Sequence, residues 1–303
     1  MVDASVTHER PASAHDYVAL LKPRVMSLVV FTGLVGYVAA PGQGDWVLGF
    51  AAILSIAVAA GASGALNMWF DSDIDAVMSR TRLRPIPAGR VNREEALMLG
   101  LTLSALSVVT MQLAAGPLAA GLLAFTIFFY AVVYTMWLKR ATPQNIVIGG
   151  LAGALPPAIA WAAKTGEVPL DGWLLVAIIF MWTPPHFWAL SLLQHKDYAN
   201  AKVPMLPVTH GAAATRTHIF IYSLLLAPFV AAPVFTGLGG LAYAITAAAG
   251  GAFFLFLAWR VLRSKAGEGI AAEDKPARDL FGFSILYLFA LFAVILAEKA
   301  VGA

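Results

Sequence analysis

Long apolar stretches, separated by shorter polar ones, recur along almost the whole chain. Most reach the roughly 18–20 residues that a helix needs to cross the hydrocarbon core of a membrane. Prolines inside the stretches, such as Pro156, Pro157, Pro184 and Pro185, predict kinks, because neighbouring helices can satisfy the freed backbone groups. The pattern predicts an all-α polytopic membrane protein with nine spans, at residues 25–41, 47–70, 95–114, 118–138, 145–163, 172–194, 216–236, 239–260 and 279–297.

Composition supports this fold class. The 303 residues are 60% hydrophobic and 12% charged, against about 25% charged in soluble domains, which excludes a large soluble enzyme. The chain has no cysteine, which excludes disulfides, thiolate nucleophiles, Cys-ligated zinc and c-type haem. Residues 1–20 lack the features of a secretory signal or a transit peptide. We expect a bacterial inner-membrane protein without a nucleic-acid partner, with a cytoplasmic tail at 1–20 and one intramembrane domain at 21–303.

The positive charges predict how the chain lies in the membrane. Every Lys and Arg except Lys164 and Lys299 falls on one side of the membrane. That side holds the N-terminus, the adjoining helix ends and the loops at 71–94, 139–144, 195–215 and 261–278. Loops rich in Lys and Arg stay in the cytoplasm. We therefore expect a cytoplasmic N-terminus, an outer C-terminus and chemistry that faces the cytoplasm.

The second span ends in an unusually acidic stretch, "NMWFDSDIDAVMSR". Asn67, Asp71 and Asp75 are four residues apart, and each step of four on a helix turns by about 400°, so the three share one face. Asp73 is predicted to point to nearly the opposite side. An amide and two carboxylates are oxygen ligands of the kind that Mg²⁺ shares with substrate phosphates. Because carboxylates at the end of an apolar helix are costly, they are functional candidates.

This stretch and its continuation, "NMWFDSDIDAVMSRTRLRPIPAGRV", resemble the first Asp-rich motif of the intramembrane prenyltransferases, the UbiA superfamily. Further stretches resemble its haem-directed branch, the protohaem IX farnesyltransferases, and the likeness runs from Leu20 to Phe289. They are "LLKPRVMSLVVFTGLVGY", "YTMWLKRATPQNIVIGGLAGALPPAIAW", "TPPHFWALSL" and "KDYANAKVPMLPVTHG".

The resemblance implies nine helices around a central cavity, in which farnesyl diphosphate and haem B react with Mg²⁺ as cofactor. The farnesyl group is transferred to a vinyl group of haem B, water adds at the same vinyl, and haem O and diphosphate are released. Haem O serves terminal oxidases directly or after conversion to haem A. Haem A synthase and oxidase assembly factors are therefore implied partners, beside the lipid bilayer.

One region departs from the wider superfamily. Most members carry a second pair of acids after span six, whereas "QHKDYANAKVP" contains only Asp197. The haem-directed branch shows the same reduction. By resemblance, Asp197 is a candidate metal or diphosphate contact.

Basic and aromatic residues near the acids are candidates for substrate binding. Cations stabilise the charge that develops on a leaving diphosphate, although positive residues also anchor helix ends in any membrane protein. An aromatic face can stabilise a carbocation, although most rings simply pack. The candidates are Lys22, Arg24, Arg80, Arg84, Tyr134, Lys139, Arg140 and Lys202.

His186, in "TPPHFW", lies inside span six and has two interpretations. It is either a neutral histidine hydrogen-bonded to another helix or a catalytic residue that binds the haem iron or positions the attacking water. We favour the catalytic interpretation.

Two other functions fit parts of the sequence. A prenyltransferase for a quinone precursor such as 4-hydroxybenzoate would share Asn67, Asp71 and Asp75 but should carry the second acidic pair. A transporter or haem carrier would more often show paired repeats and ionisable groups at mid-membrane, whereas the charges here gather at one surface.

Overall fold

The computed structural model describes residues 12–301, except for the side chain of Ala271, and contains only helices and loops within that range. Eight helical segments are long and apolar enough to cross a membrane. A ninth candidate is the pair α1 (Ala14–Leu20) and α2 (Pro23–Ala39), which meet at a 53° bend. The predicted all-α, nine-span architecture is confirmed, with the first span bent near its start.

Six further spans are single helices: α3 (Trp46–Phe70), α5 (Arg93–Ala115), α10 (Leu170–Leu193), α13 (Gly211–Thr236), α14 (Leu241–Arg263) and α15 (Lys275–Ala300), which follows the short 3₁₀ helix η2 (Ala271–Asp274). Span four consists of α6 (Pro117–Phe128), the π-helix η1 (Phe129–Leu138) and α7 (Lys139–Ala141). Span five consists of α8 (Asn145–Ala154) and α9 (Pro156–Thr165). Three short helices lie outside the spans: α4 (Ser72–Val77), α11 (His195–Asn200) and α12 (Leu206–Thr209).

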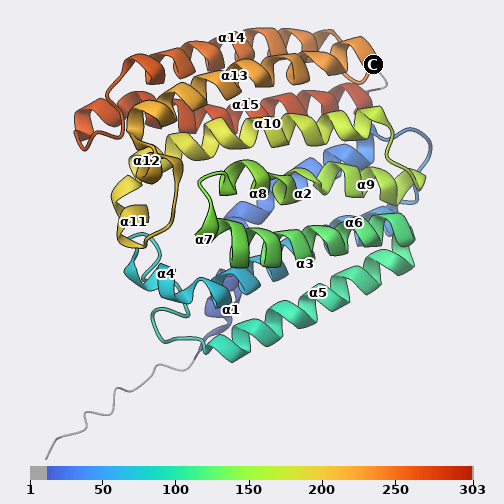
Figure 1. The fold of residues 1–303 in the computed structure, drawn as a ribbon. Coiled ribbons are helices and arrows are strands. Elements are labelled where there is room, and N and C mark those ends of the chain that lie inside the picture. Colours follow the sequence, from blue (N-terminus) through green and yellow to red (C-terminus); the bar gives the residue numbers. More distant parts are fainter. Residues whose placement is uncertain (1–11, 302–303) are drawn as a thin grey trace, which may run out of the picture.

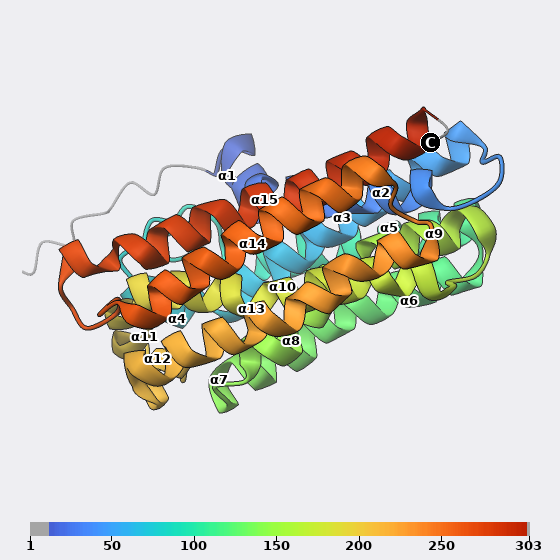
Figure 2. The same ribbon diagram turned by 90° about the horizontal axis from the view of Figure 1, so that it is seen from above.

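The spans are arranged in layers. Helices α13, α14 and α15 lie on one side of α10, and α3, α5 and α6 lie on the opposite side of the molecule, with α2, α8 and α9 between them (Figure 1). The short helices α4, α7, α11 and α12 gather at one end of the bundle, away from the C-terminus, in both views (Figures 1 and 2). We call this the loop end. It carries the acidic stretch between α3 and α5.

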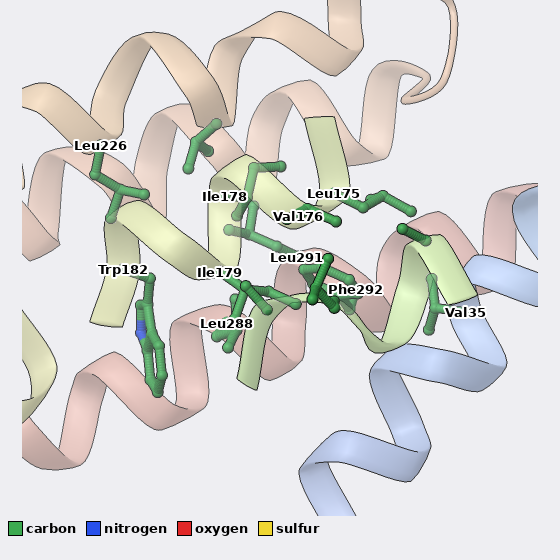
Figure 3. Packing of buried hydrophobic residues seen from close by; sticks show 14 of the residues in the cluster. Val35, Leu175, Val176, Ile178, Ile179, Trp182, Leu226, Leu288, Leu291 and Phe292 are labelled. Atoms are coloured by element: carbon green, nitrogen blue, oxygen red, sulfur yellow. The ribbon is translucent and has the colours of Figure 1, made fainter. Parts of the chain in front are cut away.

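Helix α10 is the centre of the core. Its Leu175 and Ile178 are fully buried and pack with Val35 of α2, Leu226 of α13 and Phe292 of α15 (Figure 3). In a bilayer, lipid tails are as apolar as these side chains, so close van der Waals packing has to hold the helices together. This packing therefore fixes the positions of α2, α10 and α15 relative to the loop end.

The prolines affect the two predicted helices differently. Pro184 and Pro185 lie inside α10 without ending it. Pro156 begins α9, and α8 ends two residues earlier, although Leu155 between them keeps helical angles (φ −73°, ψ −22°). Neither Pro156 nor Pro157 has an N–H to donate, so the helical hydrogen bonding is interrupted there. Span five is thus one candidate span with a break in its hydrogen bonds.

Candidate active site

The junction between α3 and α4 carries three buried polar residues. The Asp71 amide donates to the Asn67 carbonyl (2.9 Å) and the Asp75 amide to the Asp71 carbonyl (2.8 Å), so the four-residue spacing continues across the junction. Asn67, Asp71 and Asp75 are 4%, 0% and 1% exposed. The Asp73 side chain is 60% exposed. The predicted common face of the first three residues is confirmed, and Asp73 points away from it.

Asp71 lies at the centre of a hydrogen-bonded network. Its Oδ2 accepts from Lys139 Nζ (2.5 Å) and Asn67 Nδ2 (2.7 Å), and the same amide nitrogen donates to Thr135 Oγ1 (3.1 Å). Asp71 Oδ1 is buried and has no hydrogen-bond partner among the described residues, although Arg140 NH2 lies 3.6 Å away. An unpartnered buried polar atom is costly, so Oδ1 is the atom of this network with room for a further ligand.

Two more cations reach the same face. Lys22 Nζ donates to Asn67 Oδ1 (2.5 Å), and Arg84 NH1 donates to Asp75 Oδ2 (2.7 Å). Lys22 caps the start of α2 with φ 55°, a left-handed conformation that is uncommon for a residue other than glycine. The structure therefore brings Lys22, Arg84 and Lys139 onto the three predicted metal ligands.

Arg140 binds Asp73 at the exposed edge of the site. Its NH1 and NH2 donate to the two Asp73 carboxylate oxygens at 2.8 and 2.7 Å. These hydrogen bonds lower the pKa of Asp73 to about 2. The guanidinium carbon also lies 4.7 Å above the centre of the Phe70 ring. Both Asp73 oxygens are thus already occupied, whereas Asp71 has one oxygen, Oδ1, without a hydrogen-bond partner.

The other loop candidates lie apart from this network. Asp197 in α11 accepts from Ser79 Oγ (2.7 Å), a hydrogen bond that lowers the pKa of its carboxyl group. Arg24, Arg80 and Lys202 are exposed, and none of them forms an ion pair within residues 12–301. The structure therefore places these four residues without a hydrogen bond or ion pair to Asp71 or Asp75.

The π-helix η1 shapes one wall of the site. Tyr134 stacks near Tyr130, with ring centres 5.4 Å apart, and presses on α8, where a Cβ on Gly149 would lie 2.2 Å from the Tyr134 ring. The same helix supplies Thr135 to the Asp71 network. Segments of π-helix are frequent at functional sites. The sequence did not predict a role for Thr135. An α-helix was expected over this segment, and nothing in that expectation brought Thr135 close to Asn67.

An apolar cavity begins next to the network and runs between α2, α3, α6, η1, α8 and α9. Its volume is about 130 Å³. Lys22, Gly64 and Tyr130 are among its lining residues, and aliphatic side chains make up most of the others. A site for charged groups beside an apolar cavity can bind a molecule with an anionic head and a hydrocarbon tail.

His186 lies elsewhere in the bundle. It is 7% exposed, and its Nδ1 is 2.6 Å from Ser284 Oγ of α15. The ring stacks between Trp182 and Phe281, with centres 4.1 and 4.7 Å away. Ser284 Oγ also lies 2.6 Å from the Phe281 carbonyl oxygen, to which it can donate. In the tautomer of His186 that donates from Nδ1 to Ser284 Oγ, Nε2 keeps a free lone pair. His186 does not line the apolar cavity.

A family model, described as the UbiA prenyltransferase family, matches residues 29–281. The chain belongs to the UbiA prenyltransferase family. Among its curated relatives, the protoheme IX farnesyltransferase of Hyphomonas neptunium is 60% identical over 99% of this chain and 96% of its own length. The protoheme IX farnesyltransferase of Azorhizobium caulinodans is 62% identical over 94% of this chain and 92% of its own.

Two solved structures share the fold. A digeranylgeranylglyceryl phosphate synthase superposes with a TM-score of 0.77 at 16% identity, covering 94% of this chain and 98% of its own. A UbiA homologue from Archaeoglobus fulgidus, bound to DMAPP and Mg²⁺, superposes with a TM-score of 0.70 at 18% identity, covering 92% and 99%. The helical bundle expected from the resemblance is thereby confirmed.

The chemistry of the α3–α4 junction fits the divalent metal of such UbiA structures. No three His, Cys, Asp or Glu side chains cluster for metal binding in the part of the chain that the structure describes. The set at the junction is instead one amide and two carboxylates, with the unpartnered Asp71 Oδ1 among them. Such hard oxygen atoms suit Mg²⁺, which usually completes its coordination with water and substrate phosphate oxygens.

Proposed function

We propose that this protein transfers the farnesyl group of farnesyl diphosphate to a vinyl group of haem B, with addition of water, and releases haem O and diphosphate. The observation that carries the proposal is the set of protoheme IX farnesyltransferases about 60% identical to this chain over nearly its whole length. The site is consistent with it, because buried acids and cations meet an apolar cavity.

The diphosphate head is proposed to bind at the α3–α4 junction. Asn67, Asp71 and Asp75 would hold Mg²⁺, which when bound neutralises charge on the leaving diphosphate. Lys22, Arg84 and Lys139 already point into this site and would donate to phosphate oxygens. Asp197 is proposed as a further metal or diphosphate contact, and Arg140 as part of the rim.

The reaction breaks the C1–O bond of farnesyl diphosphate, the π bond of the vinyl group and one O–H bond of water. It forms a carbon–carbon bond, a carbon–oxygen bond and an O–H bond on the diphosphate. The bond between C1 of the farnesyl chain and the diphosphate oxygen breaks, and its electron pair leaves with the diphosphate. The terminal vinyl carbon of haem B attacks C1, which leaves the positive charge on the neighbouring vinyl carbon. Water adds there and gives its proton to the released diphosphate. The Tyr134 ring is proposed to shield the allylic cation from other water.

Haem B is proposed to bind on the α10 side of the site. His186 would bind its iron or position the attacking water through the Nε2 lone pair, and Arg24, Arg80 and Lys202 would bind the propionates. We further propose one intramembrane domain at 21–303, with the loop end in the cytoplasm of a bacterium. The product would pass to haem A synthase or a terminal oxidase.

The direct test incubates the purified protein with haem B, farnesyl diphosphate and Mg²⁺, and analyses the haem by mass spectrometry. The expected product carries one hydroxyethylfarnesyl group. Replacement of haem B by 4-hydroxybenzoate tests the quinone-precursor alternative. Unmodified haem, in a preparation that binds farnesyl diphosphate, would contradict the proposal.

A further inference from the structure

We infer that Arg90 is a positioning residue, which joins α1 to the 81–90 segment and thereby holds Lys22 and Arg84 against the acidic face. The inference rests on the proposed function, in which these two cations bind the diphosphate. Within residues 12–301, Arg90 forms no hydrogen bond or ion pair with the three predicted metal ligands. It therefore acts on the diphosphate site through other side chains.

The Arg90 guanidinium joins two segments that are far apart in the sequence. Its Nε donates to Asp16 Oδ1 of α1 (2.7 Å), and its NH2 donates to the Leu83 carbonyl oxygen (3.0 Å). Asp16 is 6% exposed, and its other carboxylate oxygen accepts from Ser13 Oγ (2.7 Å) at the start of α1. Loss of Arg90 would leave this buried charge without its cation, which is strongly destabilising. The ion pair therefore anchors α1 to the 81–90 segment.

The first hydrogen bond of Arg90 leads, through α1, to Lys22. Leu20 at the end of α1 is fully buried and packs with apolar side chains of α3 and α5. The chain passes so close to α3 that a Cβ on Gly64 would lie 3.1 Å from the Leu20 carbonyl oxygen. Lys22 then adopts φ 55° and donates to Asn67. A left-handed residue other than glycine persists only where its surroundings enforce that conformation, and the anchored α1 is part of those surroundings.

The second hydrogen bond of Arg90 holds the segment that carries Arg84. Leu83 directly precedes Arg84, and 74% of its surface is exposed, so packing of its side chain does little to fix it. Hydrogen bonds hold the backbone instead, from the Arg84 amide to the Thr81 carbonyl (2.9 Å) and from Arg90 NH2 to the Leu83 carbonyl. With its backbone held in this way, Arg84 donates to Asp75 Oδ2 at 2.7 Å.

The direction of one effect distinguishes positioning from a direct charge effect. Asp16→Leu removes the carboxylate and keeps a side chain of similar size. By charge alone, loss of an acid should strengthen the binding of a diphosphate or leave it unchanged. Positioning predicts the reverse, because α1 is released and Lys22 is no longer held. We expect Asp16→Leu to weaken the binding of unreactive farnesyl thiolodiphosphate with Mg²⁺ about tenfold, as for one hydrogen bond to a charged group. Arg90→Met should weaken it further, because Arg84 is released as well.

The effect of Asp16 should disappear in a protein that lacks the Lys22 ammonium group. In a Lys22→Met background, Asp16→Leu should change the affinity by less than about twofold, because residues that act through each other are not additive. The control is Asp279→Leu, which removes an ion-paired carboxylate of α15 and should keep wild-type affinity. Calorimetry measures each affinity. The inference is overturned by unchanged or tighter binding in Asp16→Leu, by equal losses in both backgrounds, or by an equal loss in Asp279→Leu.

A second measurement follows the position of α1 without a ligand. The chain has no cysteine, so spin labels can be attached through Val18→Cys and Ala88→Cys, both at exposed positions. The distance between the labels should be narrowly distributed when Asp16 is present and broadly distributed in Asp16→Leu. A narrow distribution in both proteins would overturn the inference, even if the affinity fell. A broad distribution with weakened binding, but without prenylation of haem by the wild type, would contradict only the proposed function.

Discussion

At the scale of single residues, the two oxygens of Asp71 differ in a way that bears on metal binding. Oδ2 is occupied by Lys139 and Asn67, whereas Oδ1 is buried without a hydrogen-bond partner. Asp73, two residues later, has both oxygens bound by Arg140 at the surface. The four-residue spacing of the acids was enough to predict that Asp71 and Asp75 share a helix face and that Asp73 points away from it. It could not predict the partners, because Lys139 and Asp71 are 68 residues apart and meet only through helix packing.

The acids should therefore differ in their importance for turnover. We expect Asp71→Asn and Asp75→Asn to lower the rate of haem prenylation at least about a hundredfold, or about 2.7 kcal/mol of barrier, because each removes the negative charge of a metal ligand. Asp73→Asn should keep most of the activity. The rate is measured at matched protein levels with saturating Mg²⁺. If the Asp73 variant were as impaired as the Asp71 variant, a place on the buried face would not determine which carboxylates are needed for turnover.

His186 allows a sharper test of substrate binding. We expect His186→Ala to weaken haem binding or turnover about tenfold or more, equivalent to about 1.4 kcal/mol, with little change in farnesyl diphosphate binding. Haem affinity is measured by absorbance titration, beside binding of the diphosphate. His218→Ala, in the neighbouring helix α13, is the control and should resemble wild type. Unchanged haem affinity and turnover would assign His186 to packing against Ser284, and equal loss of both ligands would indicate a folding defect.

At the scale of helices, hydropathy predicted the spans but not their internal geometry. Residues 118–138 read as one apolar helix, yet Phe129–Leu138 is a π-helix. A ten-residue apolar and aromatic segment has the same hydropathy at either pitch, so only contacts with α3 and α8 distinguish the two. The bend of α1 against α2 at Lys22 was missed for a similar reason. The apolar pattern of α2 continues smoothly, whereas the bend depends on a left-handed residue followed by Pro23.

The contact between α2 and α9 should be sensitive to one methyl group. A Cβ on Gly36 would lie 2.3 Å from the Pro157 carbonyl oxygen, and backbone atoms cannot move aside as a side-chain end can. Gly36→Ala should therefore lower the free energy of unfolding by about 1–3 kcal/mol. Thermal unfolding in detergent, followed by tryptophan fluorescence, measures the effect. Gly121→Ala, which meets no neighbouring atom, should leave the Tm unchanged or slightly higher; an equal loss in both variants would show that helix contact is not the cause.

At the scale of the whole molecule, the two ends of the bundle differ in chemistry. The loop end holds the acidic network, the short helices and the longer polar segments (Figures 1 and 2). Lys164 and Lys299 lie at the opposite end, where each donates to a backbone carbonyl, of Ala40 and Gly237 respectively. This division agrees with the unequal distribution of Lys and Arg between the two sides of the membrane. That distribution could be predicted without a structure, because it depends only on the order of spans and loops.

The same asymmetry predicts the orientation in the membrane. Because Lys and Arg are retained in cytoplasmic loops, we expect the loop end in the cytoplasm. With nine spans, the C-terminus should then be outside. A reporter fused after Ala303 should be active only outside the cytoplasm, whereas a tag in the 264–278 segment should be reached only from inside. A second tag in the short 166–169 segment, between α9 and α10, is the control for the outer side. A cytoplasmic reporter at the C-terminus, together with an outer 166–169 tag, would mean that one of the last four candidate spans (α10, α13, α14 and α15) does not cross the membrane.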